Sequence, residues 1–149
     1  MDLAVLYQDV ILDHNRSPRN FGELVNASGC AHGRNPICGD EVTVWLRVDG
    51  EEVCDVAFTG SGCAISKASA SMMTQAVKGK SRAEAEALFA QFHALVTGQG
   101  GVDERLIGKL RVFGGVARFP ARVKCASLAW HALKEALGTP NDTREDPAR

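Results

Sequence analysis

The segment "VTVWLRVDGEEVCDVAF", residues 42–58, decides the fold because it reads as a complete β-hairpin. Apolar and polar residues alternate along its first half, which is typical of a strand with one buried face. Asp49-Gly50 is a common hairpin turn, and the second half supplies the return strand. The segment near residues 24–32 is expected to pair as a third, edge strand. The sequence therefore predicts a small antiparallel three-stranded sheet.

Helices are predicted on both sides of this hairpin in the chain. Residues 2–15 carry apolar side chains at helical spacing, which gives one apolar stripe. A run of small residues begins at Cys63 and ends near Gly79, and it predicts a helix that packs closely against another element. Ser81 and Glu84 have the spacing of a capping box. Later segments with helical signals are 81–96, 103–113 and 120–138.

These elements predict an α+β fold: an N-terminal helix, a small antiparallel three-stranded sheet, and then several helices packed on it. Residues 1–138 are expected to form a single domain, because the sequence contains neither an internal repeat nor a low-complexity tract. The polar segment 139–149 is expected to fray.

Composition and charge exclude several classes of protein. The chain has 149 residues, 45% of them hydrophobic and 23% charged, which is usual for a globular protein with a buried core. Its net charge of −1 provides no basic field for nucleic acid or an anionic membrane. No apolar run is long enough to span a bilayer. The first residues lack the basic and apolar regions of a secretion signal, so we expect a cytoplasmic location.

The cysteines call for a separate explanation. An odd number of them, in a chain without a secretion signal, argues against a disulfide framework. Reduced thiols then serve core packing, metal binding or redox chemistry. The five are Cys30, Cys38, Cys54, Cys63 and Cys125.

Three of these cysteines and one aspartate form a candidate metal site. Cys38 lies in a turn before a strand, and Asp40 follows it closely. Cys63 starts a helix, where free backbone N–H groups favour a thiolate. Cys125 lies near the start of the last long helix. Three thiolates and a carboxylate make a plausible tetrahedral zinc site, although the spacing alone leaves ordinary structural roles open.

Other residues have simpler interpretations. Cys54 alternates in phase with apolar neighbours and is expected in the core. Cys30 and His32 would share one face of a strand and form a rival ligand pair. Arg122 and Lys124 are expected either to lower the pKa of nearby Cys125 or to form a solvated face. His14, His93 and His131 are expected on the surface or at helix ends, and Met72 and Met73 are expected in the core rather than at a copper site.

Four blocks of sequence, taken in order, resemble one known family. They are "LYQDVILDHNRSPRN", "NPICGD", "GSGCAISKASASMM" and "RVKCASLAW". Together they are similar to the SufU/IscU/NifU-N family of iron–sulfur cluster assembly proteins, and they are spread along nearly the whole chain.

Two features of the resemblance indicate the SufU branch. IscU-type scaffolds have a histidine directly before the third cysteine, whereas this chain has Lys124. SufU proteins also carry an insertion between the last two cysteines, and here Cys63 and Cys125 lie 62 positions apart. The resemblance thus implies zinc bound by Cys38, Asp40, Cys63 and Cys125.

The resemblance also implies a partner and a role for Cys38. The partner is a PLP-dependent cysteine desulfurase of the SufS type, with downstream iron–sulfur assembly proteins after it. In the family mechanism a desulfurase histidine takes over one zinc position and releases the first cysteine, which here is Cys38. The freed thiolate then accepts persulfide sulfur. Gly39 beside it is expected to let the turn move.

Two other functions use the same residues. The first is a scaffold that assembles iron into a [2Fe–2S] cluster on these ligands. The second is a purely structural zinc module that binds a partner. The insert at about residues 80–118 either contacts the partner or covers the sheet, and the sequence does not say whether Cys30 takes part.

Overall fold

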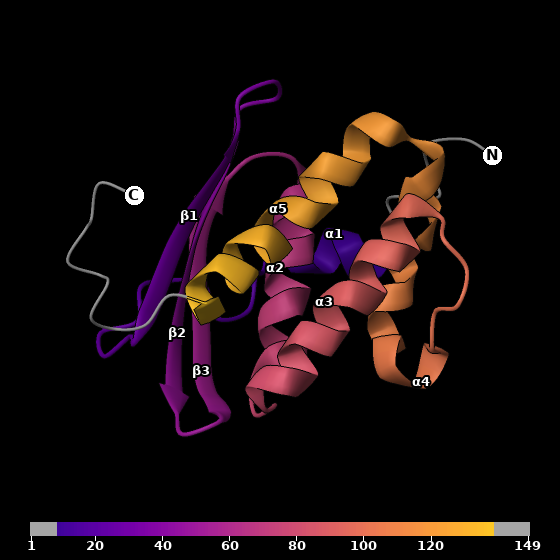
Figure 1. Cartoon of the computed structure of the whole chain (residues 1–149). Helices are drawn as coiled ribbons and strands as arrows, with labels where there is room; N and C mark the ends of the chain where they lie inside the picture. The colour runs from indigo at the N-terminus through magenta and orange to yellow at the C-terminus, as the bar shows by residue number, and fades with distance from the viewer. Residues whose placement is uncertain (1–8, 139–149) are drawn as a thin grey trace.

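A three-stranded antiparallel sheet forms one layer of the protein, and helices cover one of its faces (Figure 1). The structure is a computed structural model and describes residues 9–138. The strands are β1 (Gly29–Asn35), β2 (Asp40–Asp49) and β3 (Glu52–Ser61), in the order β1-β2-β3. The predicted α+β fold, with its helix, sheet and following helices, is confirmed.

The hairpin and the edge strand form as predicted, with one shift in position. β2 and β3 are joined through the Asp49-Gly50 turn. The edge strand begins only at Gly29, several residues after the predicted start near 24. Val25, which lies within the predicted strand, is 93% exposed. An isolated apolar residue on the surface is common and does not define a strand.

Cys54 does not lie in the core, so that prediction is wrong. The β2–β3 pairing passes from Arg47–Asp55 to Val48–Val53, and the intervening Cys54 has no partner on β2. Such a β-bulge interrupts the two-residue alternation of a strand. Val53 takes the core position, and Cys54 is left half-buried.

Three helices form the layer that covers the sheet. They are α1 (Asp9–Arg16), α2 (Ala64–Val77) and α5 (Pro120–Gly138). α5 packs on β1, β2 and α2, while α2 packs on β3 and α1. The part of the predicted first helix before residue 9 and the predicted tail at 139–149 lie outside the described residues. None of the helices between residues 9 and 138 has both the length and the apolar character needed to cross a membrane.

Small side chains bring α2 and α5 together, as the sequence of α2 predicts. Ser69 is fully buried, and its hydroxyl donates to the Ala126 carbonyl oxygen at 2.6 Å. Trp130 Nε1–H donates to the same hydroxyl oxygen at 3.1 Å. The buried hydroxyl therefore has both partners that it needs, and the two helices are joined at close range. Met72 and Met73 are buried as expected.

The insert between the second and last long helices consists of three helical pieces. α3 (Arg82–Thr97) starts with the predicted capping box, in which Ser81 and Glu84 exchange hydrogen bonds. The predicted helix at 103–113 is instead a short α4 (Glu104–Ile107) followed by the 3-10 helix η2 (Gly108–Arg118). Glycine has low helix propensity, which fits the end of the α-helical segment at Ile107.

The insert packs on α5, which itself covers the sheet. Phe92 of α3 stacks on Trp130 of α5, with ring centroids 4.6 Å apart and planes 15° apart. Phe113 of η2 meets the edge of Phe92 at 5.6 Å. All three rings are nearly inaccessible to solvent. The insert thus extends the hydrophobic core around Trp130.

We expect Phe92→Ala to lower the free energy of unfolding by about 3–5 kcal/mol, because it removes a fully buried ring from this cluster. Urea denaturation would measure the change. The control is Phe21→Ala, which truncates a ring that is 48% exposed and should cost less than half as much. Equal losses for the two variants would contradict the central position of the Phe92 ring.

Candidate metal centre

The four predicted ligands come from four different elements and meet at one end of the sheet. Cys38 lies in the turn between β1 and β2, and Asp40 is the first residue of β2. Cys63 caps the N-terminus of α2, and Cys125 lies in the first turns of α5. Glu41 pairs with the last residue of β3, Ser61, and this register brings the start of α2 beside Asp40.

Distances among these side chains bring Cys38, Asp40 and Cys125 within reach of one metal ion, whereas Cys63 lies outside this closest group and next to Asp40. The Sγ atoms of Cys38 and Cys125 are 3.9 Å apart, and together with an Asp40 oxygen they form a group within 4.8 Å. Cys63 Sγ lies 3.8 Å from Asp40 Oδ2. Two sulfur ligands of one zinc ion, each at the usual bond length, lie about 3.8 Å apart. Thiolates suit zinc and the iron of a cluster alike, so the donor set could hold either.

Asp40 connects two parts of this group. Its side chain is buried, and Oδ1 accepts a hydrogen bond from the Cys63 backbone N–H at 3.0 Å. The close approach requires glycine at position 62, where a Cβ atom would collide with the Asp40 carboxylate. Gly62 also has a positive φ of 155°, which other residues rarely adopt. Sequence analysis missed Gly62, although its place in "GSGC" directly before Cys63 was a usable signal.

The turn that carries Cys38 is held at its base and open at its tip. Asn35 is buried, and its backbone carbonyl accepts from the Gly39 N–H at 2.8 Å. Gly39 has the positive φ of 82° expected of a tight turn. Ile37 is 83% exposed, and Cys38 is exposed as well. Cys38 is thus the member of the group that a large partner could reach most easily.

The other two cysteines are more enclosed. Cys63 is half-buried, and its Sγ accepts from the Ser66 backbone N–H at 3.5 Å, as an N-cap side chain does. Cys125 is buried. Burial raises the pKa of the Cys125 thiol, and the nearby Cys63 and Asp40 raise it further. Removing that thiol's proton at neutral pH therefore calls for a strong local positive charge, such as a metal ion.

The expected effect of Arg122 and Lys124 on Cys125 is wrong. α5 directs Cys125 into the protein, whereas Lys124 is exposed. The causes of the raised pKa of Cys125 are burial and its acidic neighbours, and neither cation is among them. Neighbours in a helix sequence point about 100° apart, so adjacency along the chain did not mean contact.

The rival pair of Cys30 and His32 lies elsewhere. Both side chains are exposed on the outer face of β1, and so they do share one face as predicted. The His32 ring contacts Thr43 Oγ1 at 2.9 Å and Glu41 Oε1 at 3.6 Å. Within residues 9–138, the metal-capable group of three or more side chains includes neither Cys30 nor His32.

A cavity of about 440 Å³ lies beside the candidate centre. Its lining includes Pro36, close to Cys38, and Lys124, next to Cys125. His93 and His131, both exposed as expected, also contribute. The buried Ser127 hydroxyl in its wall has no hydrogen-bond partner among the described residues. None of the four candidate ligands is among the lining residues, so the cavity lies near the centre and does not open onto it. Its lining is mainly apolar, with Arg34 and Lys124 as the basic side chains.

Comparison with known families gives one match that spans nearly the whole chain. Residues 6–139 match the family described as the NifU-like N terminal domain. The match begins before the first described residue and includes all four candidate ligands.

Two relatives have similar identity and different names. A protein of Streptococcus pyogenes serotype M1, named iron-sulfur cluster assembly scaffold protein IscU, is 44% identical over 132 residues, which is 89% of this chain and 82% of that protein. A protein of Bacillus subtilis strain 168, named zinc-dependent sulfurtransferase SufU, is 43% identical over 136 residues, which is 91% of this chain and 92% of that protein. Sequence similarity alone thus leaves scaffold and sulfurtransferase on an equal footing.

The fold is also shared with a solved structure. A crystal structure of a candidate iron-sulfur cluster assembly scaffold protein for the SUF system, from Fervidobacterium islandicum, superposes with a TM-score of 0.86. The two chains are 35% identical, and the match covers 91% of this chain and 99% of the other. The arrangement of helices and sheet is therefore common to these proteins.

In the metal-free protein, we expect a thiol-alkylating reagent to modify Cys38 at least about tenfold faster than Cys125. Cys38 is exposed, whereas burial and a raised pKa keep the Cys125 thiol protonated and covered. Mass spectrometry of peptides after timed labelling would give both rates. In urea the two rates should become similar, and similar rates in the folded protein would contradict the described arrangement.

Proposed function

The chain belongs to the family of the NifU-like N terminal domain, with SufU and IscU proteins among its relatives, and we propose that it is a zinc-dependent sulfur acceptor. In this proposal it works in the cytoplasm in iron–sulfur cluster assembly. It takes persulfide sulfur from a PLP-dependent cysteine desulfurase of the SufS type onto Cys38, and downstream assembly proteins receive the sulfur.

One observation carries the proposal: an exposed thiol lies against a buried group of potential ligands. Cys38 is exposed on an open turn, and its Sγ is 3.9 Å from the buried Cys125 Sγ. A sulfur acceptor needs a thiolate that a partner can reach and that a nearby positive charge stabilises. This pairing of exposure and enclosure supports transfer of sulfur through Cys38.

We assign zinc to Cys38, Asp40, Cys63 and Cys125. The support is that Cys38, Asp40 and Cys125 lie within 4.8 Å of one another, with Cys63 Sγ 3.8 Å from Asp40 Oδ2. Asp40 and Cys125 are also buried, and a buried carboxylate and thiolate need a cation to balance them. Bound zinc supplies a positive charge that keeps the cysteines as thiolates near neutral pH. The presence of Lys124, where IscU-type scaffolds have histidine, also favours the aspartate-containing ligand set.

The transfer itself is a thiol–persulfide exchange. The Cys38 thiolate attacks the outer sulfur of the desulfurase's cysteine persulfide. A new S–S bond forms at Cys38 Sγ while the S–S bond of the donor breaks, and the donor cysteine leaves as a thiolate. Because one S–S bond forms as another breaks, the step needs neither an oxidant nor a reductant.

The border of the centre is suited to a partner's loop. The nearby cavity is open, and its lining combines the basic Arg34 and Lys124 with a mainly apolar surface, which favours a segment with both acidic and apolar side chains. Ile37 at the tip of the turn adds an exposed apolar contact. We infer that the desulfurase approaches from this side, because it is the side on which Cys38 is accessible.

A scaffold that assembles a [2Fe–2S] cluster on the same ligands is the second candidate. It is supported by the relative named a scaffold protein, which is as similar to this chain as the sulfurtransferase. Thiolates bind iron clusters as readily as zinc. The metal that the protein carries when purified without oxygen separates the two functions.

We expect a cysteine desulfurase with its substrate to load sulfur onto Cys38 and onto no other cysteine. Peptide mass spectrometry would locate the persulfide. Cys38→Ser should abolish it, whereas Cys54→Ser, which removes a half-buried thiol outside the group, should leave it unchanged. Normal sulfur loading of the Cys38→Ser variant would contradict the proposal that Cys38 is the acceptor. A complete lack of transfer to the wild-type protein would instead support a structural zinc module.

We expect wild-type protein purified without oxygen to carry about one zinc ion per chain, and Gly62→Ala to carry far less, since its Cβ atom would displace Asp40. Gly50→Ala is the control for backbone strain without a steric clash: it costs about 1–2 kcal/mol at a φ of 64°, in an open turn at the far end of β2. Elemental analysis would measure both. Iron with labile sulfide in the wild type would favour the scaffold instead.

A further inference from the structure

A second cavity, of about 800 Å³, lies between α1, α2 and the insert. Gln75 of α2 lines it, twelve positions after Cys63 and so roughly 18 Å further along the helix. The cavity is therefore separate from the cysteine centre. Its charged lining consists of Arg19, Arg105, Lys109 and Arg111, with the carboxylates of Asp13 and Glu104.

The charges around this cavity do not balance. Arg19 Nη2 pairs with Asp13 Oδ2 at 2.7 Å, and Arg111 pairs with Glu104 at 3.7 Å. Arg105 and Lys109 have no carboxylate within ion-pair distance among residues 9–138. Two positive charges are thus in excess, and both belong to the segment of the insert that faces α1.

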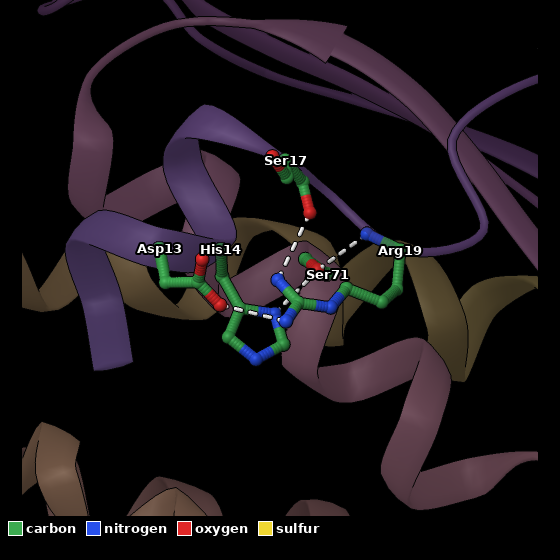
Figure 2. Close-up of polar contacts among 5 residues, drawn as sticks. All are labelled: Asp13, His14, Ser17, Arg19 and Ser71. Carbon is green, nitrogen blue, oxygen red and sulfur yellow. Dashed lines mark hydrogen bonds and ion pairs between the residues drawn. The ribbon is translucent and has the colours of Figure 1, made fainter. Parts of the chain in front are cut away.

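The floor of the cavity is a fixed network of polar groups (Figure 2). Besides its contact with Asp13, the Arg19 guanidinium donates to the Ser17 carbonyl oxygen at 2.9 Å. The Arg19 backbone N–H donates to Ser71 Oγ at 2.8 Å. Because both ends of the residue are held, the guanidinium is oriented in advance of any ligand.

His14 adds a fixed imidazole ring to this floor. Its side chain is buried, and Nδ1 lies 2.6 Å from Ser71 Oγ (Figure 2). The Ser71 hydroxyl oxygen accepts from the Arg19 N–H and still has one lone pair and its own proton, so the contact fits either neutral tautomer of His14. Burial, together with the Arg19 charge, lowers the pKa of His14, so the ring is neutral near pH 7. Nε2 points away from the network, and His14 lines the cavity.

We propose that this cavity binds a small molecule that carries phosphate groups. Two uncompensated cations match the charge of a phosphate group, which is close to −2 at neutral pH. Arginine and lysine N–H groups are strong donors to its oxygens. The volume lies in the range of small-molecule sites. A compact ligand is favoured over an acidic peptide because these charged residues line a single cavity. The proposal does not depend on the function proposed for Cys38.

Inorganic pyrophosphate titrated into the full-length, metal-loaded protein would test this by calorimetry. We expect saturable binding that Arg105→Gln and Lys109→Gln each weaken by about tenfold, because each removes a charged donor. The matched control is Arg47→Gln, which neutralises an exposed arginine on the sheet and should leave the affinity within twofold.

Nuclear magnetic resonance of the histidine rings provides a second readout. Pyrophosphate should shift the Nε2 signal of His14 and leave those of His93 and His131 unchanged. Lack of binding, or equal weakening by Arg47→Gln and Arg105→Gln, would overturn the site. Citrate or a glutamate-rich peptide binding as tightly as pyrophosphate would overturn the assignment to phosphate.

Discussion

The hydrogen bond from the Cys63 backbone N–H to the Asp40 carboxylate joins the sheet to the helical layer at the point where the candidate centre lies. The register of β2 with β3 brings the two residues together, and Gly62 leaves room for the carboxylate. An aspartate buried without such a donor would be costly. The bond therefore constrains both the end of the sheet and the start of α2, and with them two of the four proposed ligands.

The position of Cys125, the buried cysteine ligand, depends on how α5 packs against its neighbours. Trp130 bonds to Ser69 of α2 on one side and stacks on Phe92 of the insert on the other. Cys125 lies on the same helix, a little more than one turn before Trp130. The insert thus contributes to the centre from a distance, because it fixes the helix that carries Cys125. Its packing role and any contact with a partner are compatible, since Phe92 points inward while His93 is exposed.

Local patterns predicted the parts of this protein that local forces determine. The hairpin, the capping box at Ser81 and the glycine turn before Asp40 depend on neighbours in sequence, and each formed as predicted. The ordered cysteine blocks also indicated which residues would meet, although distances needed the structure. Cys54 was wrongly predicted in the core because the alternation of apolar and polar residues along a strand does not reveal a β-bulge. The environment of Cys125 was misjudged because its neighbours come from segments that are distant in sequence.

The network of His14, Ser71 and Arg19 was missed for the same reason. Ser71 lies 57 positions after His14, and only the packing of α1 on α2 brings them together. A histidine at the end of a helix predicts a favourable interaction with the helix dipole, and it does not predict a buried ring. Long-range polar contacts of this kind require a three-dimensional arrangement before they can be recognised.

The exposure of Cys38 beside the buried Cys125 has a consequence for oxidative damage to the protein. Oxidants attack accessible thiolates first, so damage would begin at the residue proposed to accept sulfur. With the two sulfur atoms only 3.9 Å apart, loss of a bound metal would leave Cys38 next to a thiol with which it could form a disulfide. A bound metal would then protect the cysteines from oxidation. The exposure of Cys38 that gives a partner access would make the metal-free protein sensitive to oxidation.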